Sequence, residues 1–263
     1  MSVRRLALYA FCLAVAVFIL APIVIVIGTS FSASPIYEFP PRQLSLRWYE
    51  NMREVPGLWS AFVLSVEIAV LSTVAAVVLG TAAAFALVRG NVPLREPLTL
   101  FLISPLMLPG IIIGIALLMA FRSIGFGSAF WGVVFGHIVI TTPYALRTVL
   151  ASLQLFQFNQ LEAAATLGAG PATALIRVLL PQIMPGIVAG ALFAFVTSFD
   201  NYAVTMFLAD ARALTLPIRI INYTETSPDP TVSAIATLLF LMSVAALFIG
   251  DRMVGLKKLS GVE

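Results

Sequence analysis

The chain has 263 residues, of which 60% are hydrophobic and 10% are charged, and its mean hydropathy is +1.04. Soluble domains carry about 25% charged residues, so this composition excludes a soluble globular protein and indicates an integral membrane protein with several spans. The net charge of +3 does not indicate a nucleic-acid-binding protein, because the basic residues are scattered around apolar segments and form no stripe.

The first apolar run extends from Ala7 to Thr29 and follows Arg4 and Arg5. It is longer than the roughly 7–15 apolar residues of a signal peptide. Pro35, just after three small residues, also disfavours cleavage there. We therefore expect a retained membrane helix.

Apolar runs long enough to cross a bilayer recur along the chain. A hydrocarbon core about 30 Å thick requires roughly 20 apolar residues in a helix. The sequence therefore predicts an all-α, polytopic integral membrane protein with six transmembrane helices in one domain, 1–263. The predicted spans are approximately 7–29, 60–88, 98–121, 128–150, 183–207 and 232–250.

The distribution of charge between the two sides predicts the orientation. On the side that holds both termini, basic residues outnumber acidic ones: Arg4, Arg5, Arg89, Arg95, Arg147, Arg177, Arg252, Lys257 and Lys258 against Glu96, Glu162, Asp251 and Glu263. On the other side the two kinds balance: Arg42, Arg47, Arg53, Arg122, Arg212 and Arg219 against Glu38, Glu50, Glu54, Asp210, Glu225 and Asp229. Because Lys and Arg concentrate on the cytoplasmic side, we expect both termini in the cytoplasm.

Glycines and prolines recur inside the predicted spans. One interpretation is close helix packing, since small residues let backbones approach. The other is that the stretches Pro105–Gly114 and Pro181–Gly190 are bends about which helices rock. The residues concerned are Gly80, Pro105, Pro109, Gly110, Gly114, Pro143, Pro185, Gly186 and Gly190.

Glu67 and His137 are ionisable side chains that fall well inside predicted spans. Glu67 lies in the outer half of the second span, where facing lipid is costly. We expect it to have a structural partner within the bundle, with a place on the solute pathway as the alternative. His137 lies in the middle of the fourth span, and we expect a hydrogen-bonded interior residue, with a pathway donor as the alternative.

The region 155–182, between the fourth and fifth spans, is predicted to form a cytoplasmic helical hairpin. Asn159 and Glu162 have the spacing of a capping box, so the first helix is expected to begin at Asn159. Gly168 and Gly170 are placed to end it.

The second helix of the hairpin is expected to begin at Pro171, a residue suited to a first helical turn, and to end before Pro181. Small residues on one face of the first helix offer a shallow surface that another protein's groove could receive. An ordinary amphipathic helix at the membrane surface is the alternative. The residues of this face are Leu161, Ala164, Ala165 and Gly168.

Asp200 lies in the outer half of the fifth predicted span, next to Asn201 and Tyr202. This mixture of carboxylate, amide and aromatic ring suits a gate for a solute that carries an amine or a hydroxyl. The same residues also suit the cap of a break in the helix, and both interpretations stay open.

The segment Glu162–Pro181, EAAATLGAGPATALIRVLLP, resembles the "EAA" signature of the permease subunits of bacterial binding-protein-dependent ABC importers, and only Val178 departs from it. The resemblance implies a coupling-helix pair that docks on an ATPase subunit. The coupling residues that it implies are Glu162, Ala163, Ala164, Gly168, Ala169 and Gly170.

The segment Ser198–Asn201, together with the later segment Leu214–Pro217, resembles the spermidine/putrescine branch of that family. It implies a small cationic solute such as a polyamine, moved by alternating access. The family further implies two ATPase subunits, a second and homologous permease chain, an extracytoplasmic solute-binding protein, and a place in the bacterial inner membrane.

The chain contains no G-x-x-x-x-G-K-[ST] phosphate loop. We therefore expect no enzyme activity, no catalytic or metal-binding residue and no cofactor in this chain, with ATP and Mg bound by the partner ATPase. A proton- or ion-coupled secondary transporter that titrates Glu67, His137 and Asp200 is the alternative. An intramembrane hydrolase is disfavoured, because the sequence has no H-E-x-x-H and no recognisable serine motif.

Overall fold

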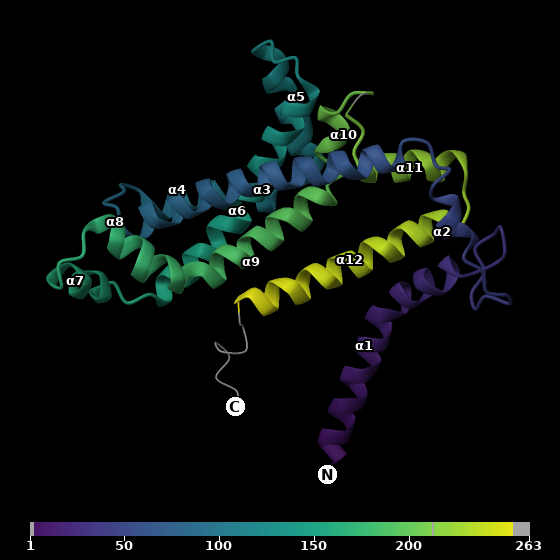
Figure 1. Cartoon of the computed structure of the whole chain (residues 1–263), viewed down its shortest axis with the longest axis horizontal. Coiled ribbons are helices and arrows are strands. Elements are labelled where there is room, and N and C mark those ends of the chain that lie inside the picture. The colour runs from purple at the N-terminus through teal and green to yellow at the C-terminus, as the bar shows by residue number, and fades with distance from the viewer. Residues whose placement is uncertain (1–2, 212, 255–263) are drawn as a thin grey trace. The chain divides into compact units, whose positions relative to one another are not determined.

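Helices make up the regular structure of the residues described by the computed structural model, which are 3–211 and 213–254 (Figure 1). Within those ranges there is no strand, and one isolated bridge joins Ser32 and Leu44. The predicted all-α class is thereby confirmed.

The chain divides into two units, 1–59 with 219–244 and 60–218 with 245–263. Whether they act as the single domain predicted from the sequence stays a prediction. Several charges used in the orientation argument lie outside the described residues: Arg212, Lys257, Lys258 and Glu263.

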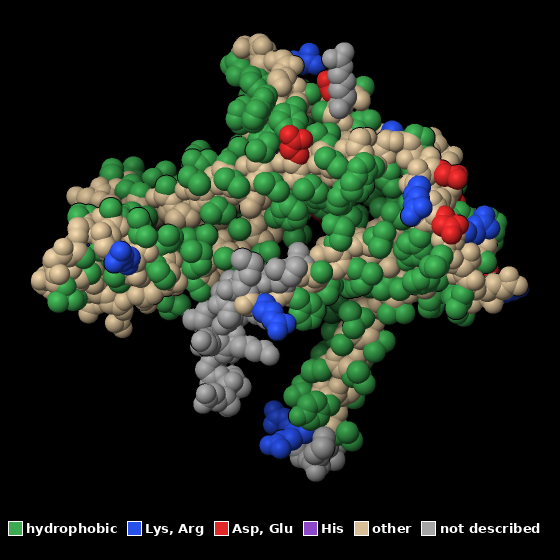
Figure 2. Space-filling model, viewed as in Figure 1, with side chains coloured by type: hydrophobic (Ala, Val, Ile, Leu, Met, Phe, Trp, Pro, Cys, Tyr) green, Lys and Arg blue, Asp and Glu red, His purple; other side chains and the backbone are tan. Residues whose placement is uncertain are grey.

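In the first unit, α1 (Val3–Ser30) is apolar around its whole circumference. Hydrophobic side chains cover most of its length in Figure 2, and Phe18 is 81% exposed. Such a surface suits a helix surrounded by lipid. At its other end the Thr29 hydroxyl donates to Ser233 Oγ of α12 (Thr231–Val254), 3.0 Å away.

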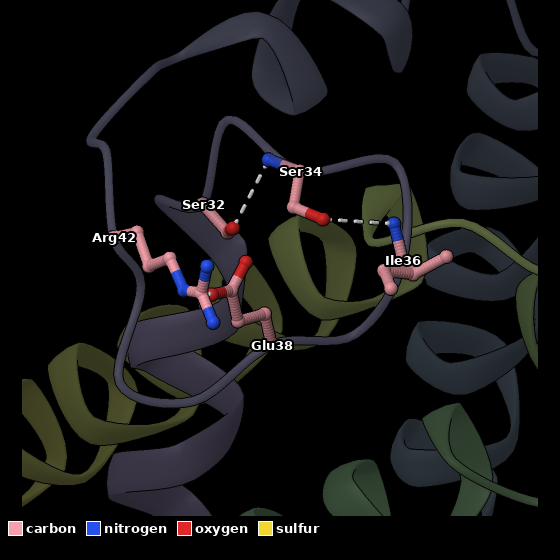
Figure 3. A network of polar contacts seen from close by, with 5 residues as sticks. All are labelled: Ser32, Ser34, Ile36, Glu38 and Arg42. Carbon is pink, nitrogen blue, oxygen red and sulfur yellow. Dashed lines mark hydrogen bonds and ion pairs between the residues drawn. The ribbon is translucent and has the colours of Figure 1, made fainter.

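The loop after α1 is ordered by local polar contacts (Figure 3). The backbone amide of Ser34 donates to Ser32 Oγ at 3.1 Å, and that of Ile36 donates to Ser34 Oγ at 3.3 Å. Arg42 and Glu38 form an ion pair with 2.7 Å between Nε and Oε1. Serine hydroxyls that bind amides two residues on are typical of tight turns, so this loop has a defined shape.

A second polar network joins α2 (Arg47–Asn51) to the part of α11 (Leu216–Thr226) in the same unit. Asn51 Nδ2 donates to the Tyr223 hydroxyl of α11 at 3.3 Å and to Thr231 Oγ1 at 2.8 Å, and the Tyr223 hydroxyl donates to Asp229 Oδ2 at 2.9 Å. Burial raises the pKa of Tyr223 above its usual value.

In the second unit, α3 (Leu58–Arg89), α6 (Ala129–Leu155) and α9 (Leu180–Phe199) lie side by side (Figure 1). A Cβ atom on Gly190 would lie 2.9 Å from Ala145 Cα, and one on Gly186 would lie 2.7 Å from the Thr148 carbonyl oxygen. Backbone meets backbone at these positions, which confirms the packing interpretation for both glycines.

The third predicted span, 98–121, is not one helix. α4 (Arg95–Ile103) leads into a 3-10 turn (Ser104–Met107), and α5 (Gly110–Ser123) then departs at 107°. The cause is a pair of prolines, Pro105 and Pro109. Neither can donate a backbone hydrogen bond, and Leu108 is extended (φ −94°, ψ 140°), as the residue before a proline prefers. A continuous helix was the wrong prediction, and the predicted bend in this stretch is confirmed.

Four described helices are long and apolar enough to span a bilayer, and the bent α4–α5 pair makes a fifth. The described apolar segment of α12 is Thr231–Ala245, shorter than the roughly 20 residues that a hydrocarbon core requires. The six-span count therefore stays a prediction.

The close approach of α6 and α9 predicts an asymmetric response to adding one methyl group. Gly190→Ala should lower the free energy of unfolding by about 1–3 kcal/mol, because the backbone of α6 cannot yield to the new Cβ. Gly132→Ala is the matched control, since its Cβ would meet only ordinary contacts at 3.7 Å and beyond. Thermal unfolding in detergent measures both, and equal melting temperatures would contradict this account.

Candidate functional site

The first helix of the hairpin, α7 (Asn159–Thr166), begins differently from the prediction. Phe158 is its N-cap and no side chain caps the first turn, so the predicted capping box of Asn159 and Glu162 is wrong. The Phe158 ring packs edge-on against Phe156 with centroids 5.1 Å apart, and the Arg89 guanidinium lies 5.4 Å from the Phe158 ring. Aromatic packing, rather than a polar cap, fixes the start of the helix.

The end of α7 agrees with the prediction. The Gly168 amide donates to the Ala165 carbonyl and the Ala169 amide to the Ala164 carbonyl, both at 3.0 Å. These two bonds define a Schellman motif, in which the residue after the cap adopts a left-handed conformation. Gly168 has φ of +87°, a conformation that glycine adopts without steric cost.

The second helix begins at Pro171, as predicted, with Gly170 as its N-cap. It does not end before Pro181. α8 (Pro171–Ala174) passes through a π-helical turn (Leu175–Leu179) directly into α9. The wide turn falls where the missing Pro181 amide would interrupt an α-helix in any case, so one helix runs from Pro171 to Phe199.

Half of the small-residue face that the sequence predicts is exposed, namely Ala165 and Gly168, and the other half is not. Leu161 packs against the hydrophobic core, and Ala164 is half-buried, as is Ala169. Leu167 is 88% exposed. We call the following set the exposed face of α7: Glu162, Ala163, Ala165, Thr166 and Leu167. Gly168 and Gly170 continue this exposure beyond the helix.

The fifth predicted span, 183–207, ends at Phe199 rather than continuing. Asp200 is the C-cap of α9, and a short turn separates it from α10 (Thr205–Leu208). Asn201 Oδ1 accepts a hydrogen bond from the Val204 amide at 2.9 Å. The polar residues thus cap a break in the helix, one of the two interpretations left open. Asp200 is exposed at this break, and Asn201 and Tyr202 are half-buried.

His137 of α6 lies beneath the break and is 1% exposed. Its Nδ1 lies 2.7 Å from Ser198 Oγ, and its Nε2 lies 2.8 Å from Thr205 Oγ1. Ser198 Oγ in turn lies 2.9 Å from Ser72 Oγ of α3. His137 is therefore the hydrogen-bonded interior residue that the sequence predicts. Ser72 was not among the residues predicted from the sequence, although the Ser65–Ser72 spacing places two hydroxyls on one face of an apolar helix.

Glu67 differs from its prediction. It is exposed on the surface of α3, and the described residues provide no hydrogen bond or ion pair to its carboxylate. The neighbouring Ile68 is buried at 1%, and one residue along a helix turns the side chain by about 100°. Among the residues that the structure describes, the predicted partner of Glu67 is therefore wrong.

A hollow of about 460 Å³ lies beside the turn between α5 and α6, with Arg122, Ser128 and Asp210 among its lining residues. Within the described ranges, no group of three His, Cys, Asp or Glu side chains could hold a metal ion.

Residues 76–256 match the family model described as "Binding-protein-dependent transport system inner membrane component". The match covers more than half of the 263 residues. The chain therefore belongs to this family of permeases of binding-protein-dependent ABC importers.

Two relatives and one solved structure illustrate the family. The spermidine/putrescine transport system permease protein PotC of Haemophilus influenzae is 30% identical over 242 residues, covering 92% of this chain and 94% of the relative. The molybdenum transport system permease protein ModB of Mycobacterium bovis is 35% identical over 211 residues, covering 74% and 78%. A bacterial ABC transporter involved in the import of the acidic polysaccharide alginate superposes with a TM-score of 0.67 at 16% identity, covering 97% and 98%.

Membership in this family makes the chain a transport subunit of the inner membrane rather than an enzyme. It leaves the alternative of an ion-coupled secondary transporter without support. His137 also does not have the accessible position in this structure that the alternative requires.

The left-handed turn at Gly168 predicts a graded response to substitution. Gly168→Val should expose the amides of residues 168 and 169 to hydrogen exchange about ten-fold more, because a side chain in this conformation costs about 1–2 kcal/mol. Gly168→Asn should have a smaller effect, since asparagine tolerates it better. Both side chains would enter open space, so equal protection in the two variants would contradict the conformational explanation.

Proposed function

We propose that this chain forms half of the solute pathway of an ATP-driven importer and receives its driving force through the exposed face of α7. The observation that supports this proposal is that one side of the hairpin is packed on the core and the other side is exposed. Its inward side is fixed to the core by Leu161 and Phe158, whereas Glu162, Ala163 and Leu167 are left exposed. A rigidly mounted surface of this kind suits docking of another protein.

The ATPase is the proposed occupant of that surface. The sequence match to the coupling signature falls on α7, and family members are named for transport that depends on a binding protein. We further propose two ATPase subunits, a second homologous permease and an extracytoplasmic binding protein as partners, with both termini of this chain in the cytoplasm.

Glu67 supports the idea that this chain does not act alone. A carboxylate on the surface of a membrane helix is costly against lipid, and the described part of the chain leaves it uncovered. A second permease packed on α3, or a water-filled pathway between the two permeases, would provide the polar surroundings that it needs.

The solute is proposed to be a small cation of the polyamine type. The PotC relative is a spermidine/putrescine permease by name, and the exposed Asp200 at the break after α9 provides a negative charge in the outer half of the predicted pathway. A molybdenum permease is also among the relatives, so the solute class rests on Asp200 more than on family membership.

Reversing the charge on the exposed face of α7 tests the docking role. Glu162→Lys should lower recovery of the ATPase in a detergent pull-down by about ten-fold, because it reverses a charge at the proposed interface. It also places a cation at the positive end of α7. Glu96→Lys is the matched control, since Glu96 is also exposed and also lies in the first turn of its helix, α4. Full ATPase recovery with Glu162→Lys would refute the docking role.

Neutralising Asp200 tests the pathway. In proteoliposomes that hold the assembled transporter, Asp200→Asn should reduce ATP-dependent uptake of radiolabelled spermidine by about ten-fold or more, the loss expected for a charge-assisted contact. Glu225→Gln, at an exposed acid of α11, should leave uptake unchanged. Normal uptake by Asp200→Asn would remove that carboxylate from the pathway.

A further inference from the structure

Four buried side chains from four helices meet beneath the break after α9. They are Ser72 of α3, His137 of α6, Ser198 of α9 and Thr205 of α10, and none is more than 3% exposed. We call this set the His137 hub. The turn that carries Asp200, Asn201 and Tyr202 lies between its last two members in sequence.

The His137 hub has fewer protons than its hydrogen-bond contacts require. Besides the two imidazole contacts and the contact between the serines, Ser72 Oγ donates to the Ile68 carbonyl at 2.7 Å and Thr205 Oγ1 donates to the Asn201 carbonyl at 2.6 Å. Ser72 Oγ also lies 3.3 Å from the Ala69 carbonyl, a longer alternative for the same proton. The five shorter contacts alone require five protons. A neutral imidazole and three hydroxyls carry only four, so one contact must lack a proton.

The surroundings indicate which contact that is. The Ile68 carbonyl lies inside α3, where the backbone amide four residues on already satisfies it. The Asn201 carbonyl lies at a helix break, and the hydrogen bond that the structure gives it within the described residues comes from Thr205. This hydrogen bond is partly buried, and a carbonyl shielded from water is costly to leave unpaired. Thr205 therefore keeps its proton on Asn201, and His137 must donate to Thr205 from Nε2.

We propose that His137 is a positioning residue: as the neutral Nε2–H tautomer it orients Thr205, which holds the Asn201 carbonyl and so fixes the turn that presents Asp200 and Tyr202 to the solute. In this arrangement Nδ1 accepts from Ser198 Oγ. The fully protonated imidazole would supply the fifth proton, but it would place an unpaired charge in an apolar bundle. The role in solute transport rests on the proposed function, whereas the tautomer does not.

His137 is the only histidine of the chain, so the tautomer can be measured directly. With ¹⁵N-histidine as the only label, solid-state NMR of the protein in lipid should show Nε2 protonated and Nδ1 as an unprotonated acceptor. A protonated Nδ1, alone or together with Nε2, would overturn the assignment.

Two substitutions distinguish the contact of His137 with Thr205 from its contact with Ser198. His137→Gln reaches the Nε2 position and can donate to Thr205, with Ser198 free to donate to Ser72. His137→Asn reaches only the Nδ1 position. The inference predicts that His137→Asn raises the KM for spermidine uptake about ten-fold with little change in maximal rate, and that His137→Gln stays within about two-fold of the unsubstituted transporter, in line with the loss of one buried hydrogen bond.

Thr141→Val is the matched structural control. Thr141 is also fully buried on α6, and its hydroxyl donates to the His137 carbonyl at 2.6 Å, away from the imidazole. It should lower thermal stability without moving KM. A KM shift as large in Thr141→Val as in His137→Asn would reduce the hub to a general packing role and refute the inference.

A solute-independent measurement completes the test. In a Cys12→Ser background, Tyr202→Cys should react with a water-soluble maleimide at least three-fold faster when combined with His137→Asn, but not with His137→Gln. If the unsubstituted transporter fails to take up spermidine while this pattern holds, the proposed solute is wrong and the hub stands. If uptake is normal and both the KM and the labelling rate are unchanged in His137→Asn, the hub inference is wrong and the proposed function stands.

Discussion

The close approach of α6 to α9 is the contact on which the second unit depends. Gly186 and Gly190 bring the backbone of α9 close to that of α6 at Thr148 and Ala145, and the small hydroxyl side chains of Ser152 and Thr148 also reach into this contact. A lipid environment provides little hydrophobic force between helices, so dispersion contacts at short range must hold them. The hairpin lies near one end of this helix pair and the His137 hub lies toward the other end. Both have defined positions because the two helices pack closely.

The two candidate functional regions are built by opposite means. The hairpin takes its shape from backbone features, namely a Schellman motif at Gly168 and a proline at the start of the next helix, and it leaves its side chains exposed. The break after α9 takes its shape from buried side chains, since Ser198 and Thr205 meet the imidazole of His137 on both sides. Exposed side chains suit contact with another subunit, and a buried polar network suits a fixed local geometry.

Local chemistry was predictable from the sequence, and long-range contact was not. Apolar runs predicted the membrane helices. Gly168 correctly predicted the end of α7, and Pro171 correctly predicted the start of the next helix. The prediction that Asn159 caps α7 was wrong, because the N-cap is Phe158, whose ring packs against Phe156. The prediction that the second hairpin helix ends before Pro181 was wrong, because a π-helical turn just before it accommodates the proline ring. The partners of His137 lie 61 and 68 residues away, and no spacing in the sequence indicates them.

The unbroken helix from Pro171 to Phe199 has 29 residues, which at 1.5 Å per residue gives a rod about 43 Å long. Its near end carries the hairpin and its far end carries Asp200. A tilt of about 5° about one end of such a rod displaces the other end by about 4 Å, comparable to the width of a water molecule or an ammonium group. A displacement of the hairpin would therefore reach the turn at Asp200 along one helix, without a relay of small rearrangements.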